Sequence, residues 1–509
     1  MTNSLDNKQA LYCITHPFKM KSRFLILCHV LALNLSGQEA YNDLNISQDV
    51  KEIVEEIEEI NMVGGSAVGE AGRKPKQYQN FENLREKANI KELIELTMHP
   101  NAVVRVYGFW GLLYTDYSDF YSIVKNHISD NEYVHTQFGC IASQMKVGDF
   151  FIELVTPGRI DSNSSKLNQT DLAQLDSTLI YESNNLSNKH SAINRAKKSE
   201  KLYPRLRFLA VNQKNQSALV AIAKFKKEQD VEIILKNRSK SKSDEGGYFY
   251  TYKAISKFPH PSFFPLLEAN LAKTLDNTHY SNEWRQLYKA IASYQNEEAV
   301  KLLKIPFENV VHYNMRKYHL DYIYDALKEF KTPIYDNLLW RLWEHEDRIT
   351  GEVYDYLSKR DSKRAFELTK KSLSNSKDFY NANLTFDYGD RIGAKSLADK
   401  MLDLAWEKDK NFTTKTIVTN LEKSSVHLFP VFTRKVLDTK GAIFINPLLN
   451  RINKESNAHI YLEAIATLIA YNEPEINKKI LLARRKNKKL NKDWGGKALD
   501  ELLKKHNIN

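Results

Sequence analysis

The chain has 509 residues, 42% of them hydrophobic, which is enough to bury an ample core in two or three domains or in one elongated array. Lys and Arg number 74 against 63 Asp and Glu, so the formal net charge at pH 7 is +11. Of the three cysteines only Cys140 follows residue 37, which excludes an intramolecular disulfide in everything beyond that position.

The first pattern along the chain is a short apolar run that does not begin at its start. Two basic residues precede residues 24–35, and small residues including Ser36 follow them. This order is typical of a bacterial export signal, and the run is too short and too polar to cross ~30 Å of hydrocarbon. We therefore predict that residues 1–19 are an over-extended start, that 20–37 is a signal peptide, and that the mature chain is periplasmic or secreted, without a transmembrane span. A buried helix of a cytosolic domain is the alternative.

Residues 41–155 are predicted to form an N-terminal helical block. Apolar residues recur there at the period of an amphipathic helix, with Glu between them, at Val50, Ile53, Val54, Ile57 and Ile60. Evenly alternating strand patterns are scarce along the whole chain, and Gly and Pro are few, at 18 and 13 residues. The sequence therefore predicts an all-α fold.

The segment 90–113 has the pattern of two helices joined by a short turn. Pro100 ends the first helix, because the residue before a proline is disfavoured in the helical conformation. The second helix opens with Val104 and Arg105. This segment resembles a HEAT repeat of the ARM type, in which the second helix of a pair opens with Val-Arg. Asn101 stands where that family usually has Asp, so the family's Asp–Arg pairing is not expected here.

Two glycines follow in the same helix. The HEAT family places small residues where two helices cross closely, and Gly108 and Gly111 stand at those positions. Each glycine costs about 1 kcal/mol of helix propensity relative to alanine. Close packing of the two helices is the expected compensation.

Similar segments recur further along the chain. Each has a small alanine near its centre, at Ala221, Ala254, Ala290, Ala326 and Ala464. The first four alanines are 33, 36 and 36 residues apart, and a fixed period in this range is typical of stacked helix pairs. The resemblance implies an α-solenoid with a HEAT-like array at 204–477, although the number of repeats between 340 and 460 stays open. Residues 156–203, rich in Ser, Asn and Lys, are predicted to be a polar connector with one short helix.

Motifs for catalysis or metal binding are mostly excluded by residue type. The loop GGSAVGEAG has two glycines at phosphate-loop spacing, but Glu70 and Ala71 stand where Lys and Ser or Thr are required. His345 lacks the second ligand of a zinc-protease helix, because Ile349 occupies that position. Cys140 is predicted to be a buried structural thiol. No cofactor or metal is expected; an enzyme whose residues meet only in three dimensions stays open.

The C-terminal segment 478–509 stands out by its charge. It holds eleven Lys or Arg residues and three acids, whereas residues 38–477 are neutral overall. A solenoid needs a terminal repeat with a polar outer face, so a basic helical cap is one interpretation. The other is a patch that binds an anionic partner. The candidate binding residues are Arg484, Arg485, Lys486, Lys488 and Lys489.

Three classes of function therefore compete. We expect a noncatalytic exported scaffold that binds a protein or an anionic envelope polymer along its helices, because solenoids present extended surfaces and no catalytic set is visible. A nucleic-acid-binding HEAT-like protein is the first alternative, but the neutral body and the export signal argue against nucleic acid. An enzyme is the second.

Overall fold

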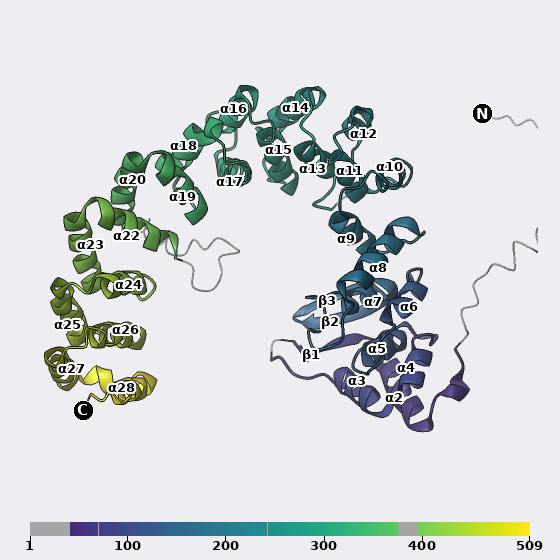
Figure 1. The fold of residues 1–509 in the computed structure, drawn as a ribbon, viewed down its shortest axis with the longest axis horizontal. Helices are drawn as coiled ribbons and strands as arrows, with labels where there is room; N and C mark the ends of the chain where they lie inside the picture. Colours follow the sequence, from purple (N-terminus) through teal and green to yellow (C-terminus); the bar gives the residue numbers. More distant parts are fainter. Residues whose placement is uncertain (1–40, 70, 242, 376–394, 509) are drawn as a thin grey trace, which may run out of the picture. The chain divides into compact units, whose positions relative to one another are not determined.

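The computed structural model describes residues 41–69, 71–241, 243–375 and 395–508, and these residues are mainly helical (Figure 1). The predicted over-extended start and signal peptide lie outside them. The chain divides into two compact units, Met1–Lys197 and Lys198–Asn509. The predicted all-α fold is wrong in one respect, because the first unit also contains a small three-stranded sheet.

The described part of the first unit contains eight α-helices and one 3-10 turn. The elements are η1 Asp43–Asn45, α2 Gln48–Ile60, α3 Lys76–Lys87, α4 Ile90–Leu96, α5 Ala102–Leu112, α6 Phe120–Asn126, α7 Val147–Val155, α8 Gln169–Tyr181 and α9 Asn188–Arg195. The amphipathic pattern of α2 buries Val50, Val54 and Ile57, whereas Ile60 is exposed. The interval 156–203 holds two complete helices, α8 and α9, rather than one.

The sheet consists of β1 Val63–Val68, β2 Tyr133–Gly139 and β3 Ile141–Lys146, in the order β1-β2-β3. β1 pairs with β2 in parallel, and β2 pairs with β3 in an antiparallel hairpin. Val134 and Thr136 are buried, so β2 covers the helical core with alternate residues. Residues 63–68 form a strand because they pair with β2, some 70 residues later in the chain. Local periodicity in the sequence does not reveal such a distant pairing.

Helices α4 and α5 approach each other closely at the two glycines. A Cβ added at Gly108 would lie 2.8 Å from Leu96 Cβ, and one at Gly111 would lie 3.0 Å from Leu93 Cδ2. Every residue of α5 is buried. The expected close packing is confirmed, and it explains why the helix contains residues of poor helix propensity.

We predict that Gly108→Ala lowers the free energy of unfolding of the N-terminal unit by up to about 2 kcal/mol. Overpacking costs about 1–3 kcal/mol, and the gain of helix propensity offsets about 1 kcal/mol of it. Urea denaturation checks the change. Gly64→Ala is the matched control, since its methyl group would meet only Pro75 Cγ, at 3.6 Å. Equal effects of the two substitutions would contradict the packing argument.

The described residues of the second unit form helices joined by loops, with one isolated β-bridge between Ser239 and Gly247. Its first half contains α10 Tyr203–Asn212, α11 Gln216–Ala223, η2 Glu228–Asp230, α12 Val231–Lys236, α13 Phe249–Lys257, η3 Pro261–Phe263, α14 Phe264–Thr274, α15 Asn282–Ala292, α16 Glu297–Lys304, η4 Ile305–Phe307 and α17 Tyr313–Glu329. Its second half contains η5 Pro333–Tyr335, α18 Asp336–Glu346, α19 Gly351–Arg360, α20 Ser362–Ser374, α22 Leu397–Lys408, α23 Lys410–Lys423, α24 Phe429–Thr439, η6 Ala442–Phe444, α25 Ile445–Lys454, α26 Ala458–Ile469, α27 Pro474–Lys486, η7 Lys488–Asn491 and α28 Asp493–Lys505.

The helices of this unit contact their neighbours in sequence order. α11, α13, α15 and α17 pack one against the next, and α23, α25 and α27 do the same (Figure 1). The alanines noted in the sequence are all buried, in α11, α13, α15, α17 and α26. The recurrent alanines are therefore core residues of this unit. Because α23 packs against α25 and α25 against α27, side chains exposed on these three helices lie on neighbouring helices.

Candidate functional site

The positive charge of the C-terminal helices is concentrated on one set of neighbours. Helices α23, α25 and α27 carry ten Lys or Arg residues and two Glu. The alternate helices α22, α24, α26 and α28 carry seven Lys or Arg and eight Asp or Glu. We call the exposed cations of the first set the basic face: Lys410, Lys415, Lys423, Lys454, Lys478, Lys479, Arg485 and Lys486.

The structure connects part of the predicted tail patch to this face. Arg485 and Lys486 end α27 and belong to it, and Lys488 and Lys489 follow, exposed, on η7. Arg484 is bound differently, since its guanidinium donates to Asn491 Oδ1 at 2.7 Å and pairs with Asp500. Arg484 is therefore committed to an intramolecular contact, whereas the other four predicted residues present their charge to solvent.

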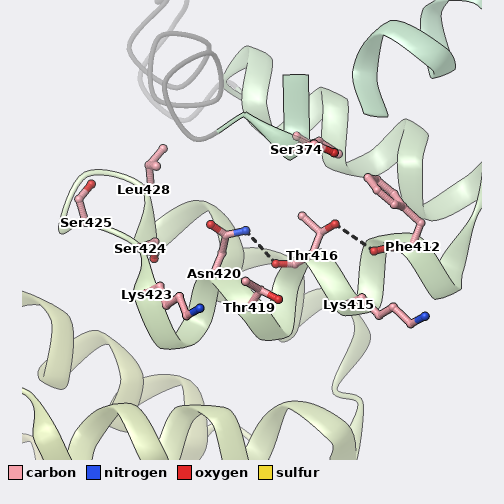
Figure 2. A pocket seen from close by; sticks show the side chains of 11 residues that line it. Ser374, Phe412, Lys415, Thr416, Thr419, Asn420, Lys423, Ser424, Ser425 and Leu428 are labelled. Carbon is pink, nitrogen blue, oxygen red and sulfur yellow. Dashed lines mark hydrogen bonds between the residues drawn. The ribbon is translucent and has the colours of Figure 1, made fainter. Parts of the chain in front are cut away.

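A groove of about 710 Å³ lies along α23 (Figure 2). Lys415, Thr419 and Lys423 follow one face of the helix at four-residue spacing, and all three are exposed. Phe412 of α23 also lines the groove, and the remaining walls come from Leu373 and Ser374 at the end of α20 and from Ser424, Ser425 and Leu428 between α23 and α24. The described residues of the lining include two lysines and no carboxylate, so their net charge is positive.

Hydroxyl and amide groups make up much of the groove wall. Asn420 Nδ2 donates to the carbonyl of Thr416 at 2.8 Å, and Thr416 Oγ1 donates to the carbonyl of Phe412 at 3.0 Å (Figure 2). Ser424 also lines the groove, is only 6% exposed, and its Oγ has no hydrogen-bond partner among the described residues. An unsatisfied buried hydroxyl costs about 1–3 kcal/mol, so a polar ligand that reaches this wall would recover part of that cost.

A second groove, of about 390 Å³, continues from α23 to α25. Its walls are Glu422 and Lys423 of α23, of which Lys423 also lines the first groove, together with Asn450, Arg451 and Lys454 of α25 and the following Glu455. Among the residues that the structure describes, no ion pair is recorded for Lys415, Lys423 or Lys454. These amines are free to interact with a ligand.

Arg451 fixes the geometry between the two grooves. Its guanidinium donates to the carbonyls of Glu422 at 2.7 Å and Ser424 at 2.9 Å, and to Glu455 Oε2 at 2.6 Å. Burial acts to raise the pKa of Glu455, but backbone N–H groups of Asn457 and Ser456 and the charge of Arg451 outweigh it and hold that pKa below its usual value. Arg451 thus caps the end of α23 while its own charge is largely neutralised by Glu455.

A third hollow, of about 460 Å³, adjoins the tail. Lys489 and Lys492 line it together with His459, and Trp494 stands beside them, 55% exposed. The Trp494 and His459 rings lie 5.0 Å apart. This hollow lies at the first turns of α26 and α28, and of the predicted tail residues Lys489 lines it.

In two Asp–His pairs of the described residues the side chains lie within 4 Å of each other: His312 with the exposed Asp276, at 3.6 Å, and His127 with Asp130. His127 Nδ1 lies 3.4 Å from Asp130 Oδ2, but His127 is only 4% exposed and its Nε2 is buried without a partner. Arg105 binds the same carboxylate, so the cluster has the geometry of a structural ion pair rather than of a reactive site. In the described part of the chain, no group of three or more His, Cys, Asp or Glu could hold a metal ion.

The prediction of a buried thiol at Cys140 is wrong. Cys140 is exposed at the turn between β2 and β3, because residues 133–146 form a hairpin instead of a helix. Its neighbour in sequence, His135, projects from β2 toward Gln144 of β3. Neither residue lies in one of the grooves described above.

Comparison with known proteins gives no identification. No family model matches the chain, and neither a curated protein nor a solved structure is significantly similar to it. None of the described helices is both long and apolar enough to pass through a membrane. Function must therefore be argued from the charge and shape of the C-terminal helices.

The sequence identified the tail but missed the cations of α23 and α25. Lys415, Lys423 and Lys454 are diluted in a region of neutral net charge, so composition hides them. The spacing of Lys415, Thr419 and Lys423 was a usable signal, since residues at i, i+4 and i+8 share a helix face. Their proximity to α27 follows only from the packing of alternate helices.

Proposed function

We propose that this protein is a noncatalytic binding scaffold: an exported α-solenoid of HEAT-like helix pairs whose basic face binds an anionic partner in the bacterial envelope. The observation that carries the proposal is the segregation of charge between alternate C-terminal helices. A merely solubilising surface needs no such segregation, whereas a polyanion is attracted to a surface on which one sign of charge is continuous.

The helix contacts in sequence order support the solenoid part of this proposal. Stacked helix pairs present the same exposed side of each repeat to one partner, so a ligand can extend over several helices. Export rests on the signal-like segment 20–37 alone. A nucleic-acid partner fits the same charge pattern through phosphate contacts, and the experiment below includes it.

The test is retention of the purified protein on sedimented envelope fragments. We expect Arg485, Lys486, Lys488 and Lys489→Gln together to weaken retention at least about tenfold, since each cation near an anionic surface contributes on the order of 1 kcal/mol. Retention of the unchanged protein should fall steeply with added salt. N-terminal sequencing of the exported protein should show that the mature chain begins near Gln38.

The matched control removes four charges from the alternate helices, by Lys408, Lys497, Lys504 and Lys505→Gln. These lysines are exposed on α22 and α28 and leave the basic face intact. Similar losses in the two variants would mean that net charge alone governs retention. Quantitative displacement by sheared DNA at low concentration would favour the nucleic-acid alternative.

A further inference from the structure

The spacing of the two lysines in the Figure 2 groove restricts the size of its ligand. Lys415 and Lys423 are eight residues apart on α23, which corresponds to about 12 Å along a helix axis. In Figure 2 the two side chains leave opposite ends of this helix face and the Lys415 amine points away from Lys423, so the two amines offer separate contact points for anionic groups. The ligand that uses the whole groove therefore carries at least two anionic groups on one backbone.

The cations continue beyond this groove onto the neighbouring helices. Lys423 also lines the groove that leads to Asn450 and Lys454 of α25, and α25 packs against α27. Packed helices lie about 8–10 Å apart, so the three helices span roughly 20 Å. A ligand that follows both grooves is therefore linear and extended, with its anionic groups at the lysines and away from the Glu422 carboxylate.

The uncharged groups of the grooves indicate what lies between the anionic groups. Thr419, Ser425 and Asn450 are exposed, and Ser424 lacks a partner for its hydroxyl. Such groups exchange hydrogen bonds with a hydroxylated backbone. Among the described residues of the two groove linings, Phe412 alone is aromatic, and it is half-buried. Single-stranded nucleic acid is usually held by stacking on exposed rings.

Membrane binding is also disfavoured by the composition of this face. A helix that inserts into an interface presents a row of large apolar residues. On α23, α25 and α27 the large apolar side chain that is strongly exposed is Leu482 alone, at 52%. Charge and hydroxyl content therefore favour a hydrated polymer over a lipid surface.

We propose that the basic face binds a linear acidic polysaccharide, whose chain lies in the α23 groove, crosses to α25 at Lys423 and continues toward α27. The inference rests on the proposed function, because it names the anionic partner of the same face. The lysine amines bind the acidic groups, and the Ser, Thr and Asn side chains bind the sugar hydroxyls.

The experiment is isothermal titration of the full chain with alginate oligomers of two, four, eight and sixteen residues. Affinity should rise at least about tenfold from the dimer to the octamer and then level off, because only a longer chain engages cations on more than one helix. Replacing Lys415, Lys423 and Lys454 by Gln together should weaken octamer binding at least about tenfold. The dimer should bind weakly to both the variant and the unchanged protein. Lys497, Lys504 and Lys505→Gln on α28 should change it less than about twofold.

Each other outcome overturns a defined part of the argument. Length-independent affinity, or equal losses in the two lysine variants, would overturn the path across α23 and α25. Tighter binding of oligothymidylate or of phosphatidylglycerol vesicles than of alginate would assign the face to nucleic acid or to membrane. Salt-sensitive self-association in sedimentation would indicate that a second copy occupies the face, through an acidic hollow such as that lined by Glu52, Glu56 and Glu86. If the protein without substitutions did not bind envelope fragments at all, the proposed function itself would be overturned.

Discussion

Replacing Arg105 by Met should lower the free energy of unfolding of the N-terminal unit by about 3–5 kcal/mol, the cost of breaking a buried ion pair by removing one partner. The Arg105 guanidinium contacts Asp130 Oδ2 at 2.9 Å and Glu132 Oε2 at 2.6 Å, and it donates to the carbonyls of His99 and Pro100, both at 2.9 Å. Met fills a similar volume but leaves the half-buried Asp130 carboxylate without its cation and two carbonyls without a donor.

The pKa of Asp130 provides a second readout. Burial acts to raise it, but hydrogen bonds from His127 and the charge of Arg105 outweigh burial and hold the pKa below its usual value. The ion pair therefore stabilises the fold above the unfolded pKa of about 3.9 and loses that contribution as the pH falls through the folded pKa. The stability difference between the Met variant and the unchanged protein should shrink below about pH 4.

Hydrogen exchange in urea, read by mass spectrometry, separates the two units. Peptides from α5 should lose protection in the variant, and peptides from the second unit should not. Arg159→Met is the matched control, since Arg159 is exposed and lies 3.7 Å from Glu153; it should cost at most about 1 kcal/mol. Combining Arg105→Met with Asp130→Asn should cost about 1–3 kcal/mol less than the sum of the single changes. Strict additivity would contradict the pairing.

Arg105 also shows how far local sequence can lead. The Val-Arg opening predicted a helix pair at 90–113, and α4 and α5 form there. Asn101 caps α5 by accepting from the backbone N–H groups of Val103 and Val104, so its amide performs the local task of an Asp without its charge. The carboxylates that replace that charge come from Asp130 and Glu132, in a loop about 25 residues later. No local pattern specifies that long-range contact.

The sheet was missed for a related reason. β2 does alternate, with Val134 and Thr136 buried between exposed neighbours, and Gly139-Cys140 forms its hairpin turn. That signal was present but short, and it lay among long helical patterns. β1 carries no comparable signal, because residues such as Gly64 and Gly65 have little strand propensity. Its extended form depends on pairing with β2 and on the bond from Gly64 N–H to Tyr107 Oη, at 2.8 Å.

The candidate site divides in the same way between local and long-range information. Charge counting along the chain found the tail, because its excess is contiguous in sequence. The face is contiguous only in space, since α23, α25 and α27 are separated in sequence by α24 and α26, whose formal charges of +1 and −1 cancel. A repeat of known length would have allowed every second helix to be summed separately. The degenerate sequence between 340 and 460 prevented that step.

Acid should destabilise the C-terminal unit through His319, with an effect of about 3 kcal/mol. His319 is 0% exposed; its ring stacks on Trp284 at 4.3 Å, and its Nδ1 lies 2.6 Å from Tyr288 Oη. Burial lowers the pKa of His319 from 6.5 to about 4, and no charged group contributes to the shift. Its Nε2 has no hydrogen-bond partner among the described residues, so a proton there would be both charged and unsolvated.

The direction of the effect follows from proton binding. Between pH 6.5 and about 4 the unfolded chain holds a proton on His319 and the folded chain does not, so protons favour unfolding. Stability is full above pH 6.5 and falls as the pH approaches 4. Urea denaturation across this range, followed by circular dichroism and tryptophan fluorescence, measures the slope.

Other groups also titrate in this range, so the decisive quantity is the difference in slope between variants. Tyr288→Phe with His319→Phe keeps an aromatic ring against Trp284 and removes the titrating group together with its partner hydroxyl. This double variant should lose about 3 kcal/mol less between pH 6.5 and 4 than the unchanged protein does. Tyr288→Phe alone keeps the buried imidazole and should retain the full slope. The two variants differ only at His319. If the double variant lost as much stability in acid as Tyr288→Phe alone, the loss would have to arise from other titrating groups in the unit.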